Sequence, residues 1–168
     1  IIHEEFAEHL VAMEGDLINT KKIIVIGDSE EHVSYEVWRD TQETTFEPVP
    51  SSGDDVSMQL YTSGTTGLPK GAQLTNDNFN AVFENVDWFM NSESRNLAVM
   101  PLFHIAGSGW ALYGMSCGAT TVMTRELDPV AILQLIETET ITHALFVPAV
   151  LQFFLMIPSD EINLSSME

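Results

Sequence analysis

The feature that most constrains this chain is the run at residues 61–71, which lies between two apolar segments. The run contains three glycines and a closing lysine, Lys70, together with four short hydroxyl side chains: Thr62, Ser63, Thr65 and Thr66. Glycine lets the backbone adopt left-handed conformations and approach a ligand closely. Successive backbone N–H groups in such a turn form an anion site, to which Lys70 adds a positive charge. The run therefore predicts a loop that holds phosphate oxygens.

The run differs from the Walker A loop of P-loop proteins, in which Gly-Lys-Ser/Thr opens a helix. Lys70 lies three residues after Gly67 and is followed by residues 71–74, which have the pattern of a strand. We therefore expect a loop between two strands, residues 56–61 and 71–74, with no helix dipole to assist anion binding. A plain surface loop is the alternative, but the run has more glycine and hydroxyl residues than a turn needs.

The complete run, Tyr-Thr-Ser-Gly-Thr-Thr-Gly-Leu-Pro-Lys-Gly, resembles the signature loop of the AMP-forming adenylating enzymes. This superfamily includes acyl-CoA synthetases, insect luciferases and the adenylation domains of peptide synthetases. The resemblance implies that the loop closes over the β- and γ-phosphates of ATP and that Lys70 is catalytic. It also implies that Thr62 ligates Mg²⁺. The implied cofactor-binding residues are Thr62, Ser63, Gly64, Thr65, Thr66, Gly67 and Lys70.

A second motif, at residues 101–107, follows an expected buried strand at residues 96–100. Ligands of open α/β sheets bind beyond the carboxyl ends of the strands, so His104 is a candidate site residue, although a lone histidine is more often structural. An aromatic residue followed by histidine resembles the second signature of the same family. The resemblance implies that His104 is catalytic and lies beside the substrate carboxylate, with Ile105 and Ser108 lining the acyl tunnel.

The residue at position 104 also narrows the substrate. Amino-acid-activating members of the family carry an aspartate there, which pairs with the substrate ammonium in a charge-assisted contact. Imidazole does not replace that contact, so we expect a carboxylic acid without an α-amine, and a fatty acid in the first instance. Some long-chain members carry a tryptophan gate at the position of Ser108, whereas the nearest tryptophan here is Trp110. A luciferase or an aryl-acid ligase remains an alternative, because the loop is common to all of them.

Composition restricts the remaining possibilities. The chain has 168 residues, of which 45% are hydrophobic, so a globular fold with a sizeable core is expected. Six Lys and Arg against 25 Asp and Glu give a net charge of −19, a field that repels nucleic acid and anionic lipid. The same field repels ATP, so Lys70 and bound Mg²⁺ have to overcome it locally. The single cysteine, Cys117, excludes an internal disulfide, and the sequence shows no Cys/His cluster typical of zinc sites.

The longest apolar stretch, residues 144–157, is too short to span a bilayer, and the acidic N-terminus lacks the basic region of a signal peptide. We therefore expect a cytoplasmic protein without integral membrane association.

Apolar periodicity predicts an α/β fold. Strands are expected at residues 22–27, 56–61, 71–74, 96–100, 119–124 and 142–147, and helices at 3–14, from about 34, and at 76–90, 108–116, 129–139 and 148–157. Thr75 and Asp128 are expected N-caps. The apolar stripe of the 76–90 helix is expected to pack in the core; it comprises Phe79, Val82, Phe83, Val86 and Phe89. Alternating strands and helices predict a mostly parallel sheet flanked by helices.

The resemblance extends over essentially the whole chain and is strongest at residues 56–157. The family's adenine strand, Mg²⁺-binding glutamate, ribose-binding aspartate and C-terminal domain would follow Glu168. We therefore expect residues 1–168 to be one partial domain, a piece of the N-terminal domain of an acid–CoA ligase that uses ATP, Mg²⁺ and CoA. The alternative is a folded subdomain without turnover that binds an anion or a partner weakly. Exposed apolar faces on such a piece would favour homo-oligomers.

Overall fold

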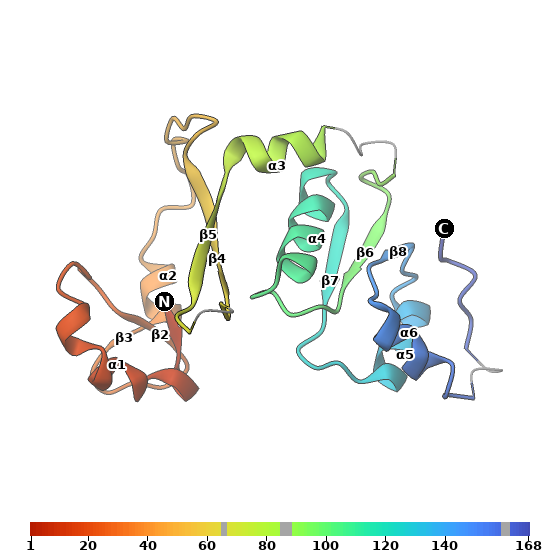
Figure 1. Cartoon of the computed structure of the whole chain (residues 1–168), viewed down its shortest axis with the longest axis horizontal. Helices are drawn as coiled ribbons and strands as arrows, with labels where there is room; N and C mark the ends of the chain where they lie inside the picture. The colour runs from red at the N-terminus through yellow and green to blue at the C-terminus, as the bar shows by residue number, and fades with distance from the viewer. Residues whose placement is uncertain (65–66, 85–88, 159–161) are drawn as a thin grey trace. The chain divides into compact units, whose positions relative to one another are not determined.

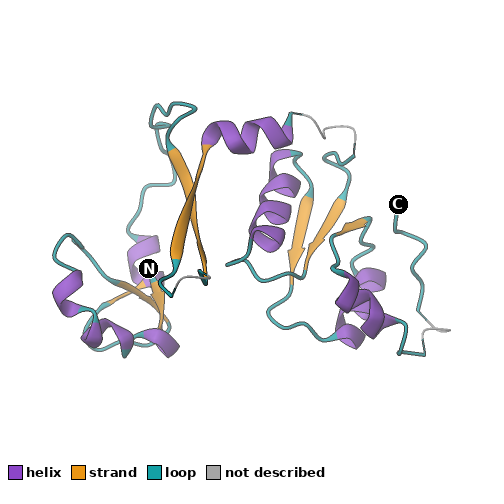
Figure 2. Cartoon of the chain, in the orientation of Figure 1, coloured by secondary structure: helices purple, strands orange, loops and turns teal. Residues whose placement is uncertain are grey.

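The computed structural model describes residues 1–64, 67–84, 89–158 and 162–168, and combines helices with short strands (Figures 1 and 2). The chain divides into two compact units, Ile1–Pro50 and Ser51–Glu168. The assignment of residues 1–168 to one partial domain stays a prediction.

The first unit contains a parallel sheet of three short strands in the order β1 (Ile2–His3), β2 (Ile24–Ile26) and β3 (Val33–Ser34). The central strand β2 is the expected apolar one, and its Ile24 and Val25 are buried. Helix α2 (Tyr35–Asp40) follows β3 and packs against β2, so the helix expected from about residue 34 is confirmed.

The single helix expected at residues 3–14 is wrong, because this segment forms three separate turns. They are η1 (Glu4–Phe6), α1 (His9–Ala12) and η2 (Glu14–Asp16). Phe6 and Met13, from the expected apolar stripe, are about half exposed, and a helix gains most of its stability from packing such a stripe. In addition, the Glu4 carboxylate accepts a hydrogen bond from the Asp28 N–H at 2.7 Å, which ties the first turn to the loop after β2.

The second unit begins with an antiparallel hairpin of β4 (Val56–Thr62) and β5 (Lys70–Thr75). This confirms that the glycine-rich run joins two strands. A separate parallel sheet follows, with the strand order β7 (Thr120–Met123), β6 (Arg95–Ala98) and β8 (His143–Ala144).

The helices of the second unit are α3 (Asn76–Phe83), α4 (Ile105–Ser116), α5 (Pro129–Thr138) and α6 (Pro148–Phe154). Both expected N-caps are confirmed. The Thr75 side chain accepts from the Asn78 N–H in a capping box, and the Asp128 carboxylate accepts from the N–H groups of residues 130 and 131. Helix α3 ends at Phe83, earlier than expected, while residues 85–88, which include Val86 of the expected stripe, lie outside the described residues.

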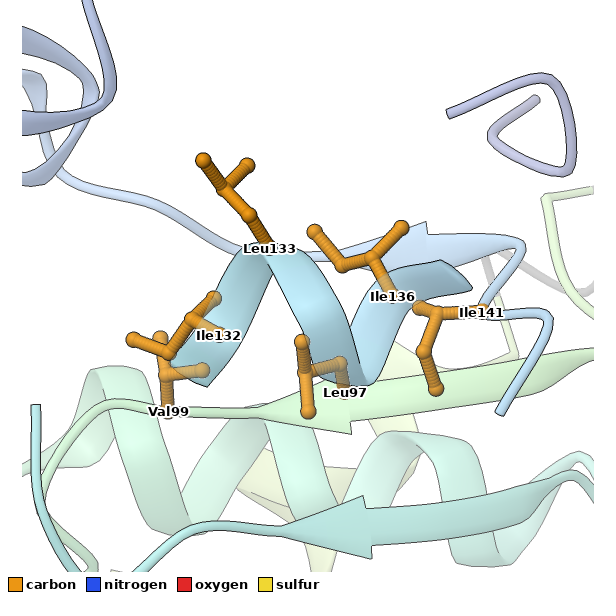
Figure 3. Packing of buried hydrophobic residues seen from close by; sticks show 6 residues of the cluster. All are labelled: Leu97, Val99, Ile132, Leu133, Ile136 and Ile141. Atoms are coloured by element: carbon orange, nitrogen blue, oxygen red, sulfur yellow. The ribbon is translucent and has the colours of Figure 1, made fainter. Parts of the chain in front are cut away.

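Helices cover both faces of the β7-β6-β8 sheet, as the sequence predicts. On one face, α5 packs on β6 through a buried cluster (Figure 3) that consists of Leu97, Val99, Ile132, Leu133, Ile136 and Ile141. On the other face, α4 contacts β6 and β7. Side chains alternate along a strand, so Leu97 points towards α5 while its neighbour Asn96 reaches α4.

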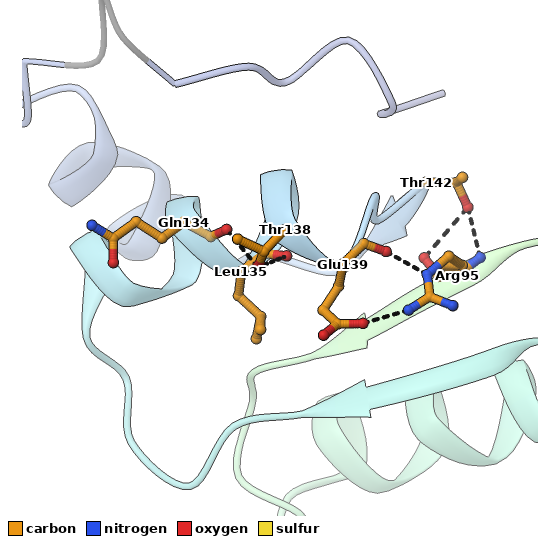
Figure 4. Close-up of polar contacts among 6 residues, drawn as sticks. All are labelled: Arg95, Gln134, Leu135, Thr138, Glu139 and Thr142. Atoms are coloured by element: carbon orange, nitrogen blue, oxygen red, sulfur yellow. Dashed lines mark hydrogen bonds and ion pairs between the residues drawn. The ribbon is translucent and has the colours of Figure 1, made fainter.

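A polar network joins the end of α5 to the starts of β6 and β8 (Figure 4). The Arg95 guanidinium donates to the Glu139 backbone carbonyl and pairs with the Glu139 carboxylate at 2.5 Å. The Arg95 N–H donates to the Thr142 hydroxyl at 2.9 Å. These contacts fix the crossover from α5 to β8, so they hold the edge strand in register with β6.

The close approach of α4 to β6 depends on Gly114. Asn96 is fully buried, and its amide donates to the Trp110 backbone carbonyl at 3.2 Å. A Cβ atom at Gly114 would lie 2.3 Å from the Asn96 amide nitrogen and 2.8 Å from the Thr121 hydroxyl. Only glycine therefore leaves room for the Asn96 side chain under the helix.

We expect Gly114→Ala to lower the free energy of unfolding by about 1–3 kcal/mol, because overpacking outweighs the better helix propensity of alanine. Gly109→Ala, in the same helix, is the matched control, since its new Cβ meets only the end of the Ile105 side chain at 3.2 Å. Urea unfolding of the two variants measures the difference. Equal stabilities would show that Gly114 is not needed for packing.

Candidate functional site

The glycine-rich loop is the turn of the β4–β5 hairpin, closed by the register pair Thr62 and Lys70. The Thr62 hydroxyl lies 3.5 Å from the Lys70 backbone carbonyl. Gly64 and Gly67 have φ angles of +63° and +110°, in the region that favours glycine. A Cβ at Gly64 would lie 2.4 Å from the Leu68 carbonyl oxygen, so that turn is closed to larger residues.

The described polar side chains of this loop face solvent. Thr62, Ser63 and Lys70 are exposed, and Lys70 forms no ion pair with the described residues. A ligand can therefore approach the ammonium group and the hydroxyls from outside. The other two predicted phosphate-binding hydroxyls, Thr65 and Thr66, lie outside the described residues. The binding and catalytic roles of the loop stay predictions.

His104 is the N-cap of α4, which explains why this helix starts three residues earlier than the sequence pattern indicates. The Nδ1 atom of His104 accepts a hydrogen bond from the Ala106 N–H at 3.1 Å. Because this bond needs the lone pair of Nδ1, the ring proton of the neutral imidazole is on Nε2. The residue is exposed, so Nε2–H is the donor that a ligand could meet.

The two residues expected to line the acyl tunnel have different surroundings. The Ile105 side chain lines a cavity, described next, and is 43% exposed. Ser108 is buried, and its hydroxyl donates to the His104 backbone carbonyl at 3.2 Å. It is not among the residues that line that cavity. A substrate-binding role for either residue stays a prediction.

A cavity of about 370 Å³ lies along α4. Its walls come from α3, from α4, and from the segments that precede β6 and follow β8, and almost all are apolar: Val82, Phe89, Ile105, Ala106, Gly109, Trp110, Tyr113 and Leu145. The Phe89 and Tyr113 rings lie 6.1 Å and 5.9 Å from the Trp110 ring, measured between centroids. Small residues at positions 106 and 109 leave the space in front of these rings.

The sequence reasoning missed this cavity, because it assigned the α3 stripe wholly to the core. Val82 is 57% exposed and Phe89 is 42% exposed, and both line the cavity instead. The signal that could have revealed it is the pair of small residues, Ala106 and Gly109, on the same side of a helix as Trp110.

Two features are absent from the described ranges. No group of three or more His, Cys, Asp or Glu side chains there could hold a metal ion by itself. No helix within those ranges has the length and apolar character needed to cross a membrane.

Comparison with known proteins identifies the family. The model of the family described as "AMP-binding enzyme" matches residues 1–167. A feruloyl-CoA synthase of Amycolatopsis sp is 39% identical over 107 residues, which cover 62% of this chain and 22% of that protein. A 4-coumarate–CoA ligase of Nicotiana tabacum is 34% identical over 157 residues, which cover 88% of this chain and 29% of that protein. This chain thus spans about a quarter of the length of these relatives.

A solved structure agrees with this result. The anthranilate CoA ligase AuaEII, in complex with anthranoyl-AMP, superposes with a TM-score of 0.86 and 25% identity, covering 99% of this chain and 34% of that one. The fold, the intact loop and the family match agree, and this chain belongs to the family of AMP-binding enzymes, with the fold of the adenylate-forming acid–CoA ligases.

Proposed function

We propose that this chain is part of the N-terminal domain of an acid–CoA ligase that activates an aromatic carboxylic acid. The observation that carries the proposal is the exposed loop of hydroxyls, glycines and Lys70, set on a hairpin in a chain of the AMP-binding family. Because the chain spans about a quarter of its relatives, we propose that turnover needs the complete enzyme.

The proposed reaction has two steps. The substrate carboxylate attacks the α-phosphate of Mg·ATP, which forms an acyl-adenylate and releases pyrophosphate. The CoA thiol then attacks the acyl carbonyl, and AMP leaves. Positioning and electrostatic stabilisation dominate catalysis of phosphoryl chemistry, so binding of the leaving phosphates is the main task of this loop.

The loop residues suit that task by their chemistry and exposure. The β- and γ-phosphates would be bound by the Ser63 hydroxyl, the Lys70 ammonium and backbone N–H groups of the turn. Gly64 and Gly67 give the turn the left-handed conformation that such a backbone anion site needs. Thr65 and Thr66 would add two hydroxyls. The Thr62 hydroxyl is an oxygen ligand of the kind that Mg²⁺ accepts beside phosphate and water, so it would hold the ion that accompanies ATP.

His104 would act at the acid end. Its Nδ1 is occupied as a helix cap, so its exposed Nε2–H would donate to the substrate carboxylate. A neutral imidazole donates this hydrogen bond without cancelling the negative charge of the substrate carboxylate, which is the nucleophile. The imidazole provides no negative charge to pair with a substrate ammonium group, so it favours an acid without an α-amine.

The cavity walls support an aromatic acid rather than the fatty acid first expected from the sequence. Three rings, from Phe89, Trp110 and Tyr113, line a space near the lower end of the volume range of small-molecule sites. Aromatic rings pack well against a planar aromatic substrate in offset or edge-on geometry. Both curated relatives described above are named for acids of this kind, feruloyl and 4-coumarate. A fatty acid is the second candidate, because the walls are almost entirely apolar.

In the complete enzyme, we expect Lys70→Ala to reduce acid-dependent ATP–pyrophosphate exchange by about 10²–10³-fold, as for the loss of one group that stabilises developing charge. Lys22→Ala, an exposed lysine in the first unit, is the matched control and should leave the exchange unchanged. Undiminished exchange in the Lys70 variant would remove this lysine from the mechanism.

Comparing cinnamate with hexadecanoate as substrates of the unaltered enzyme tests the class of acid.

We expect Gly64→Ala to raise the KM for ATP more than Gly67→Ala does. Both substitutions force alanine into a left-handed conformation, but only the Gly64 variant brings its Cβ to 2.4 Å from a backbone oxygen. Initial-rate kinetics with varied ATP measure the two effects. Equal KM values would show that the shape of the turn at Gly64 does not matter for nucleotide binding.

A further inference from the structure

One wall of the cavity is attached to the sheet by both its side chain and its backbone. The indole N–H of Trp110 donates to the Leu97 carbonyl at 3.1 Å, and the Trp110 carbonyl accepts from the Asn96 amide at 3.2 Å. Leu97 and Asn96 are adjacent on β6 and have no exposed surface. Two neighbouring residues of the buried central strand therefore fix this one residue of α4.

Packing around Trp110 restricts its movement further. The rings of Phe89 and Tyr113 lie about 6 Å away, and Gly114 keeps the helix close enough for Asn96 to reach it. Rotation of the indole would break its hydrogen bond to the Leu97 carbonyl of the buried strand β6. Trp110 is therefore a fixed wall, unlike a gate that swings.

The distance between His104 and Trp110 limits the length of the acid that the cavity accepts. Trp110 lies six residues beyond His104, which is about 9 Å along the axis of an α-helix. If His104 faces the carboxylate, as in the proposed function on which this inference rests, the acid has about that length before it meets the indole. A phenylpropenoic acid is of this size, whereas a long-chain fatty acid is much longer.

We infer that Trp110 is a specificity-determining wall that limits the substrate to a short, ring-sized acid, and that Asn96 is the positioning residue that holds it. Trp110 and Asn96 determine how long an acid can bind, and neither takes part in the reaction at the carboxylate. Variants of either residue should therefore change the KM for long acids much more than the kcat for short ones.

The test uses the complete enzyme and compares kcat/KM for cinnamate and for hexadecanoate. We expect Trp110→Ala to shift the ratio towards hexadecanoate by about tenfold or more, since small steric changes in an apolar pocket have effects of this size. Trp110→Phe keeps a ring but loses the indole donor, and Asn96→Leu removes the donor to the Trp110 carbonyl. Both should shift the ratio in the same direction by less, and both test the inference if Trp110→Ala does not fold.

Trp38→Phe, in the first unit, is the matched control and should leave the ratio unchanged. Asn96→Leu should also weaken the near-ultraviolet circular dichroism of the indole, because Trp110 becomes less constrained. An unchanged ratio in active Trp110 variants would overturn the inference and leave the proposed function standing. Absence of acid-dependent exchange with any acid in the unaltered enzyme would overturn both.

Discussion

The contact between β6 and α4 is the interaction on which the rest of the second unit depends. Two hydrogen bonds make this contact: the Asn96 amide donates to the Trp110 carbonyl, and the Trp110 indole N–H donates to the Leu97 carbonyl. The contact forms only because Gly114 leaves space for the Asn96 side chain. On its opposite face, the same strand carries Leu97 into the cluster beneath α5. One buried strand thus positions a helix on each side, and the cavity is a product of the distance at which α4 is held.

The start of α4 is held by a second close contact. A Cβ at Gly107 would lie 2.3 Å from the backbone oxygens of Met100 and Pro101, so the helix packs directly on the segment that leaves β6. His104 caps the helix at this point with Nδ1. The structural and the proposed chemical roles of this histidine are compatible, because the cap sets the tautomer and leaves the Nε2–H of an exposed side chain available to donate.

The acidic charge of the chain makes Lys70 on the β4–β5 hairpin important for any binding of phosphate. The net charge of −19 disfavours any polyphosphate near this chain, and Lys70 is one of only three Lys and Arg residues in the second unit, with Arg95 and Arg125. Arg95 is already paired with Glu139. Lys70 stands on an exposed hairpin, where it can reach a ligand without the cost of breaking an ion pair within the described residues. Phosphate binding would therefore depend on this lysine, the loop amides and the metal ion that accompanies the nucleotide.

The sequence by itself determined the features that depend on neighbouring residues. The hairpin around the glycine-rich run, the caps at Thr75 and Asp128 and the parallel sheet between helices follow from local pattern and turn chemistry. Tertiary structure decided that residues 3–14 form separate turns, because no packed face supports a long helix there. It decided that α4 begins at Ile105, after its N-cap His104. It also decided the cavity, whose walls at Val82, Phe89, Trp110 and Leu145 come from segments far apart in the chain. An apolar stripe in a sequence indicates only that this face of the helix is shielded from water. Whether that face meets the core or borders a cavity depends on the distance between elements, which is set here by Asn96 and Gly114.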